Sequence, residues 1–139
     1  MLPPSNDHRE LLQQLEEFQL DQPAVELPFS ARLAREQGWT REFANRAVRE
    51  YKRFLFLCVT EPLPVCPSEQ VDEVWHLHLT YTRSYWGDLC QRVLGRPVHH
   101  DPTTGGAEQL DHHLEMYERT LASYHQAFGE APPADLWPP

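Results

Sequence analysis

The stretch VDEVWHLHLTYTRSYW, residues 71–86, gathers side chains that bind metal ions or transfer protons. Asp72 and His76 are four residues apart, a spacing that stacks a carboxylate and an imidazole on one flank of a helix. Such a pair offers two ligands to a divalent cation, but it also forms a hydrogen bond without any ion. His76 and His78 point about 200° apart on a regular helix, so an undistorted helix cannot direct both of them to one ion.

His78 lies on the helix face that the sequence predicts to be buried. A rotation of about 100° per residue aligns six residues in one stripe: Val71, Trp75, His78, Thr82, Tyr85 and Leu89. One interpretation of His78 is a neutral core histidine that forms a hydrogen bond with a tyrosine or with the backbone. The other interpretation is a functional role, and the sequence leaves both open.

A third metal ligand could come from the motif VHHDP at residues 98–102, which offers His99, His100 and Asp101. A straight helix over residues 68–94 would end about 27 Å beyond His76. The residues from that end to His100 span at most about 18 Å. The motif therefore reaches His76 only if the chain turns back, and we predict a break in the helix at Gly87.

Histidines of the last predicted helix are the other source of a ligand. If this helix is antiparallel to the histidine-bearing one, His125 comes near the level of His76. The same arrangement leaves His112 and His113 near the loop histidines. Because these two flank an apolar stripe, we expect them at its rim or on the surface.

The elements that position these residues are all predicted to be helices, since apolar residues recur at three- and four-residue steps between Pro and Gly. We predict an all-α fold, one domain over residues 1–139, in the form of a compact bundle of about five helices with short connections. A Pro-rich tail follows at 129–139, where Leu136 and Trp137 could dock on the bundle. The first and the last helix are expected over residues 7–20 and 108–128. Between them, a second helix is expected from an N-cap at Ser30 to Gly38, and a third from an N-cap at Thr40 to the prolines at 62–67. A fourth is expected from an N-cap at Ser68 to residue 94. The stripe of the last helix contains Leu110, Leu114, Tyr117, Leu121, Tyr124 and Phe128.

Charge and composition restrict the partners. Twelve basic residues against 21 acidic ones give a net charge of −9, which disfavours nucleic acid and membrane surfaces. The first ten residues show neither the basic nor the apolar region of a secretory signal, and no long apolar run follows. The three cysteines lack metal-finger spacing, so we expect a cytoplasmic protein with free thiols. A protein partner remains open, and its first candidate surface is the arginine-rich face of the third helix. The sequence indicates no oligomeric state.

Three stretches, YKRFLFL, PSEQVDEVWHLHLTYTRSYW and LGRPVHHDP, resemble the glycine-rich domain-containing protein-like family, a domain of unknown function. The family pattern is matched here by Asp72, Trp75, His76, His78, Tyr85, Leu94, Gly95, His100 and Asp101. The resemblance covers roughly residues 51–102 and carries no reaction. In plants the domain lies in longer proteins with an RNA-recognition module and a glycine-rich tail. This chain has six glycines and resembles a stand-alone bacterial-type version.

The resemblance implies that the helix and the loop form one site. Our first hypothesis is therefore a divalent ion bound by Asp72, His76 and His100, with Zn²⁺ favoured and non-haem Fe²⁺ as the alternative. A catalytic ion would activate water in a hydrolase-like site, with His78 and Tyr85 as proton-transfer residues or as residues that orient the ligands. The second hypothesis is a non-enzymatic protein-interaction module, in which the same residues form a structural hydrogen-bond network. The sequence leaves open whether the protein is an enzyme.

Overall fold

The computed structural model describes residues 6–101 and 107–139, and these residues form helices and no strand. Six helical elements are described: α1 (Asn6–Glu17), α2 (Phe29–Gln37), α3 (Arg41–Thr60), α4 (Glu69–Thr80), the π-helix η1 (Arg83–Leu94) and α5 (Ala107–Phe128). The prediction of a compact all-α fold is confirmed. One element more than expected is present because the predicted fourth helix is divided into α4 and η1.

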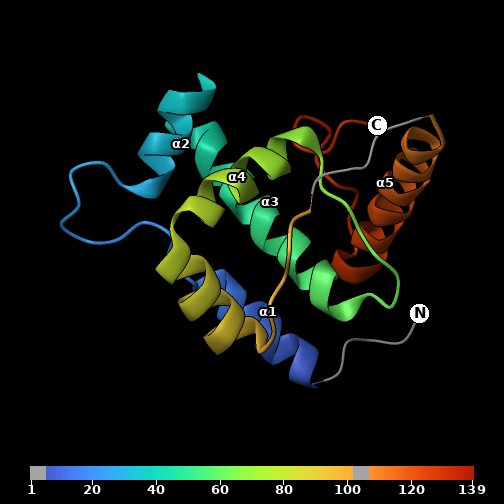
Figure 1. The fold of residues 1–139 in the computed structure, drawn as a ribbon, viewed down its shortest axis with the longest axis horizontal. Helices are drawn as coiled ribbons and strands as arrows, with labels where there is room; N and C mark the ends of the chain where they lie inside the picture. Colours follow the sequence, from blue (N-terminus) through green and yellow to red (C-terminus); the bar gives the residue numbers. More distant parts are fainter. Residues whose placement is uncertain (1–5, 102–106) are drawn as a thin grey trace.

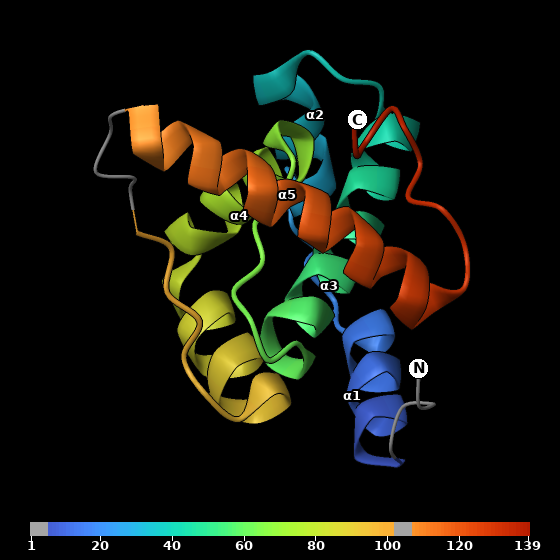
Figure 2. The same cartoon turned by 90° about the vertical axis from the view of Figure 1, so that its right-hand side faces the viewer.

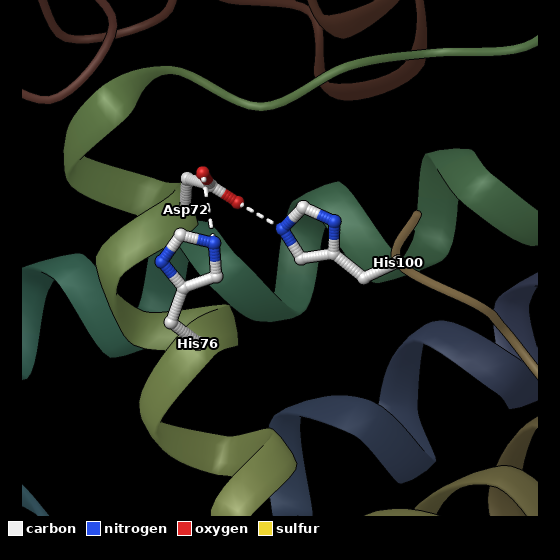
Figure 3. Close-up of side chains that lie close together, drawn as sticks. All are labelled: Asp72, His76 and His100. Atoms are coloured by element: carbon white, nitrogen blue, oxygen red, sulfur yellow. Dashed lines mark hydrogen bonds and ion pairs between the residues drawn. The ribbon is translucent and has the colours of Figure 1, made fainter. Parts of the chain in front are cut away.

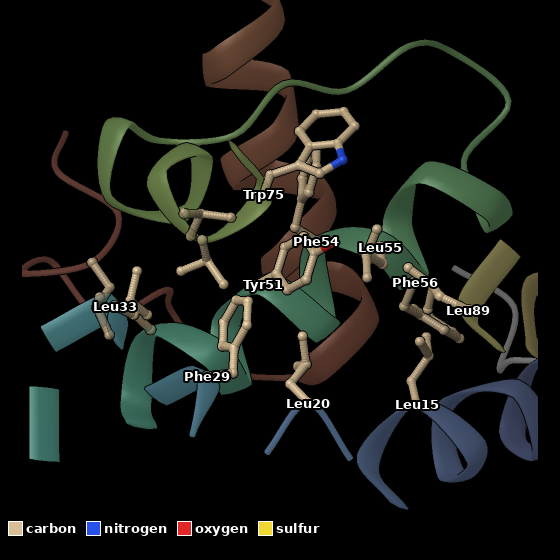
Figure 4. Packing of buried hydrophobic residues seen from close by; sticks show 14 of the residues in the cluster. Leu15, Leu20, Phe29, Leu33, Tyr51, Phe54, Leu55, Phe56, Trp75 and Leu89 are labelled. Carbon is tan, nitrogen blue, oxygen red and sulfur yellow. The ribbon is translucent and has the colours of Figure 1, made fainter. Parts of the chain in front are cut away.

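The long helix α3 is the centre of the fold, since it contacts α1, α2, α4 and α5 (Figures 1 and 2). Its N-cap is Thr40, whose hydroxyl accepts a hydrogen bond from the backbone N–H of Phe43, as predicted. Tyr51 and Phe54 are fully buried, and Figure 4 shows them among the leucine and aromatic side chains of the neighbouring helices. Burial of each large apolar side chain stabilises the fold by about 1.5–3 kcal/mol.

The ends of several helices follow the predicted capping residues. Gly38 and Gly95 end α2 and η1 in the left-handed conformation, at φ 71° and 74°, and the Ser68 side chain caps α4. The Ser30 cap is wrong, because α2 begins at Phe29. The backbone N–H and the hydroxyl of Ser30 instead donate to the Asp21 carboxylate, each over 2.7 Å.

The chain turns back at Tyr81, so the predicted break at Gly87 is wrong in position. Gly87 lies inside η1, whereas α4 ends at Tyr81, whose φ of −91° and ψ of 71° leave the helical region. The Tyr81 hydroxyl accepts a hydrogen bond from Arg32 over 2.9 Å, and its ring contacts Phe29. Long-range contacts therefore hold the bend without a glycine or a proline.

The reversal carries η1 against α1, and the segment after η1 then runs back to α4 (orange in Figure 1). Of the six residues in the predicted core stripe, Thr82 is exposed because the regular helix has ended before it. The other five are buried: Val71, Trp75, His78, Tyr85 and Leu89.

The two halves of α5 differ in burial. Leu110 and Leu114 were predicted in the core, but both side chains are more than half exposed. Figure 2 shows the first turns of α5 (orange) extending past the neighbouring helices. The second half packs on the body through the buried Tyr124, and the tail residues Leu136 and Trp137 are buried as predicted.

The three cysteines are free thiols, as expected from their number and spacing. Burial raises the pKa of Cys58 to about 12 and that of Cys66 to about 11, so both remain protonated at neutral pH. Among the described residues, no helix combines the length and the apolar character needed to cross a membrane.

The position of the bend predicts opposite effects of two glycine substitutions in one segment. Beyond the neighbouring backbone, no atom lies within 4 Å of a Cβ added at Gly87 or Gly95, so the backbone conformation decides the outcome. Gly87→Ala should raise the free energy of unfolding by about 0.5–1 kcal/mol, because helical glycine carries an entropic cost. Gly95→Ala should lower it by about 1–2 kcal/mol, because its φ is positive. Urea denaturation of both variants measures the difference, and a loss of stability in Gly87→Ala would contradict the helical assignment.

Candidate metal centre

The first two turns of α4 position the carboxylate and one imidazole of the candidate centre. The Ser68 hydroxyl accepts a hydrogen bond from the Val71 N–H over 3.1 Å, and the Asp72 N–H donates to the Ser68 carbonyl over 2.8 Å. Asp72 thus lies at the positive end of the helix dipole, where a carboxylate is favoured. His76 follows one turn later, with Nε2 3.2 Å from Asp72 Oδ2.

His100 completes the cluster from the returning segment. Its Nε2 is 2.6 Å from Asp72 Oδ1, although the two residues are 28 positions apart in the sequence. Figure 3 shows the two imidazoles facing the carboxylate, one from α4 and one from the loop, each joined to a different oxygen of Asp72. One donor atom from each of Asp72, His76 and His100 lies within 4.8 Å of the other two. The structure therefore brings together the three residues predicted as metal ligands.

The ring of His100 is held between two other rings. The Trp75 indole stacks on it with centroids 4.1 Å apart, and the His76 imidazole stacks on it at 4.8 Å. Trp75 is buried, so its indole forms a fixed wall for His100. Trp75 was predicted on the core stripe, but its stacking on His100 was not predicted, although its position beside His76 was an available signal.

Tyr85 fixes both Trp75 and the segment that carries His100. Its hydroxyl accepts a hydrogen bond from Trp75 Nε1 over 2.9 Å and donates one to the Val98 carbonyl. Burial raises the pKa of Tyr85, which keeps the hydroxyl protonated and able to donate. Tyr85 thus acts on the cluster through Trp75 and Val98, by holding the ring that stacks on His100 and the segment that carries His100.

His78, the other predicted catalytic residue, lies apart from the cluster. It is fully buried, with Nδ1 2.7 Å from the Tyr51 hydroxyl and Nε2 2.9 Å from the Ser84 hydroxyl. Burial lowers the pKa of His78 to about 3, so the imidazole is neutral at physiological pH. This geometry matches a core histidine bonded to a tyrosine and gives His78 no contact with Asp72, His76 or His100 among the described residues.

A pocket of about 560 Å³ opens beside the cluster. Besides Asp72, His76 and His100, its lining includes Trp75, Glu69, Asp101, Met116 and three further histidines, His99, His112 and His113. His112 and His113 are exposed, as expected, at the rim of this pocket. His125 does not line the pocket and lies roughly 18 Å along α5 from His113, so its predicted place beside His76 is wrong. The reason is that the first half of α5, through His112, His113 and Met116, lines the pocket together with residues of α4.

The donor set is suited to a divalent cation. Two imidazole nitrogens and one carboxylate oxygen satisfy three positions of a tetrahedral or octahedral ion, and ligand distances of about 2.0–2.2 Å place such donors a little over 3 Å apart. His100 and His76 would bind through Nε2 with the proton on Nδ1. The two short distances run to different oxygens of Asp72, 2.6 Å from His100 to Oδ1 and 3.2 Å from His76 to Oδ2, and the three donor atoms lie within 4.8 Å of one another, so binding one ion requires the side chains to move closer together.

These features define an all-α protein with a two-histidine, one-aspartate cluster between a helix and a returning loop. The chain belongs to the UCP032817-like family, whose model matches residues 13–122. It is similar to Glycine-rich domain-containing protein 2 of Arabidopsis thaliana, at 27% identity over 107 residues, which cover 73% of this chain and 14% of that protein. Glycine-rich domain-containing protein 1 of the same plant is 28% identical over 117 residues, which cover 73% of this chain and 13% of the relative.

These matches confirm the resemblance to the glycine-rich domain-containing family, and they extend it well beyond the motif-bearing residues 51–102. The chain spans only a small part of the length of the two plant relatives. No solved structure matches the chain.

The role assigned to the Tyr85 hydroxyl is tested by Tyr85→Phe. The variant leaves Trp75 Nε1 without its acceptor, so we expect a loss of about 1–3 kcal/mol in stability. Hydrogen exchange in residues 95–101 should also rise, because the Val98 carbonyl loses its donor. Tyr51→Phe is the matched control, since it removes a buried hydroxyl that binds His78 and should not change exchange in that segment. Equal exchange in residues 95–101 of both variants would contradict the assignment.

Proposed function

We propose that the chain binds one divalent metal ion through Asp72, His76 and His100. The observation that supports this proposal is the convergence of three donor atoms within 4.8 Å from two segments far apart in the sequence. The stacking of His100 on Trp75 adds support, because a fixed imidazole has less freedom to lose when it binds an ion.

Zn²⁺ is the favoured ion. Two histidines and one carboxylate are a common set of three protein ligands for zinc, with the fourth position left to water or substrate. The same set binds non-haem Fe²⁺ as a facial triad, which makes iron the alternative. Zinc is preferred because the sequence carries no motif for a redox cofactor.

A hydrolase-like reaction is the activity that this centre would support. A bound Zn²⁺ lowers the pKa of its water to about 7 and polarises a carbonyl or phosphoryl oxygen. The pocket of about 560 Å³ lies beside the donor atoms, and its volume suits a small-molecule ligand. The buried Trp75 forms one wall of this pocket.

A non-enzymatic interaction module is the second candidate, and the hydrogen bond within the cluster favours it. Asp72 accepts a hydrogen bond from His100 and faces His76, so all three side chains have partners without an ion. In this role the hydrogen bonds of the cluster hold the segment that carries His100 against α4, and the resulting surface binds a protein partner.

Metal analysis of the purified full chain separates the two candidates. After growth with zinc and iron present, we expect one equivalent of metal in the wild type and less than about one tenth of that in His76→Ala and His100→Ala. His76→Ala is the more informative variant, because its side chain is 52% exposed and its loss should leave the fold intact. His125→Ala, an exposed histidine on α5, is the matched control and should retain the metal.

Thermal unfolding supplies the second readout. If the centre binds zinc, the ion should raise the melting temperature of the wild type and of His125→Ala, since about 100 Kd of ligand adds roughly 2.7 kcal/mol. It should leave His100→Ala unchanged. A wild type without metal, together with a lower melting temperature in Asp72→Asn and His100→Ala, would reject the metal proposal in favour of the structural network.

A further inference from the structure

The C-terminal tail is bound to the body as a peptide is bound in a groove. Leu136 and Trp137 are 0% and 2% exposed. The Trp137 ring packs against Tyr124 at 5.8 Å and against Phe54 at 6.4 Å, and its Nε1 donates to the buried carboxylate of Glu50 over 3.1 Å. Figure 2 shows this segment (red) returning from the end of α5 along α3.

Charged contacts fix the rim of this groove. Arg46 forms a two-point contact with the Asp135 carboxylate, over 2.7 and 2.9 Å. Arg53 binds Glu130 over 2.8 Å. The arginine-rich face of α3, predicted as a surface for an acidic partner, thus meets acidic residues of the chain's own tail.

Backbone contacts complete the recognition of the tail. The Ser68 hydroxyl donates to the Leu136 carbonyl, and the Tyr117 hydroxyl donates to the Pro138 carbonyl, each over 2.6 Å. Buried anchor side chains, a charged rim and backbone hydrogen bonds are together the means by which proteins recognise extended peptides. We call this surface the tail groove; it is formed by Arg46, Glu50, Arg53, Ser68, Tyr117 and Tyr124.

Two contacts connect the tail groove to the candidate metal centre. The first is Ser68, which donates its only hydroxyl proton to the tail and thereby presents its lone pairs to the Val71 N–H at the start of α4. The second is a row of aromatic rings: Trp137 contacts Phe54, Phe54 contacts Trp75 at 5.1 Å, and Trp75 stacks on His100. Detachment of the tail would weaken the hydrogen bonding in the first turn of α4. It would also remove the packing of Trp137 on Phe54, which in turn supports Trp75 in the wall of the pocket beside the cluster.

We propose that the tail groove is a recognition site for an acidic–aromatic peptide, that residues 130–138 occupy it within the chain, and that its occupancy controls the order of the Asp72, His76 and His100 cluster. The same segment supplied by a separate molecule fills the groove when the chain's own tail is weakened. Occupancy also sets metal affinity, a consequence that rests on the proposed function.

Peptide rescue of full-chain variants tests the proposal. Trp137→Ala removes the buried anchor, and Asp135→Asn weakens the exposed contact with Arg46. Hydrogen exchange in residues 68–76 should rise about tenfold in Trp137→Ala and by a smaller factor in Asp135→Asn. Exchange in α2 should stay unchanged in both variants, because no hydrogen bond, ion pair or ring contact joins α2 to the tail in the described residues.

A synthetic peptide of residues 129–139 is then added at about 1 mM, the order of the effective concentration of a tethered segment. It should restore slow exchange in residues 68–76 of Trp137→Ala, whereas the same peptide with alanine in place of its tryptophan should not. If Trp137→Ala loses its helical circular dichroism and is therefore unfolded, hydrogen exchange in residues 68–76 is measured in Asp135→Asn and Arg46→Ala instead. Unchanged exchange in residues 68–76 of these folded variants overturns the proposal.

Zinc affinity separates this inference from the proposed function. If the wild type binds zinc, Trp137→Ala should bind it about tenfold more weakly, and the peptide should recover most of that loss. If the wild type binds no zinc but exchange responds as described, the groove proposal stands and the metal proposal fails. If the wild type binds zinc and the folded tail variants bind it equally well, control of the cluster by the groove is refuted.

Discussion

A single hydroxyl group, that of Tyr85, joins the two segments that form the candidate site. It accepts a hydrogen bond from Trp75 on α4 and donates one to Val98, two residues before His100. A buried hydroxyl with two partners is costly to displace, because each lost partner leaves a polar group without compensation. The path of the returning loop, the orientation of the Trp75 ring and the position of His100 therefore depend on one another, and all three depend on the reversal at Tyr81 that brings η1 beside α4.

Helix α3 supplies the common support for the site and for the tail. Over little more than one helical turn, Glu50 binds the tail, Tyr51 binds His78 of α4, and Phe54 packs between Trp75 and Trp137. These buried polar and aromatic contacts set the relative positions of the packed elements, since a polar group moved out of register would lose its partner. The same contacts therefore serve stability and the geometry of the cluster.

In the cluster of Asp72, His76 and His100, one imidazole is held in place by packing and the other is accessible from the pocket. Trp75 and the fold restrict His100 from one side, whereas His76 is half exposed and faces the pocket. If the proposed centre binds an ion, three coordinate bonds would replace the short hydrogen bond between His100 and Asp72. The chain belongs to the UCP032817-like family, and the part of the two plant relatives that is similar to it covers 14% and 13% of their lengths.

The sequence by itself determined the features that depend on neighbouring residues: the helical periodicity, the caps at Thr40 and Ser68, and the stacking of Asp72 and His76 at i and i+4. Only the tertiary structure decided where the chain reverses and which apolar stripe is covered, and it places His100, which the family resemblance had nominated, beside Asp72. The reversal shows the reason. Gly87 had the local freedom to bend, but contacts of Tyr81 with residues about fifty positions away in the chain set the bend there instead. Periodicity and capping are local hydrogen-bonding and steric effects, whereas packing between distant segments has no signature in any short window of sequence.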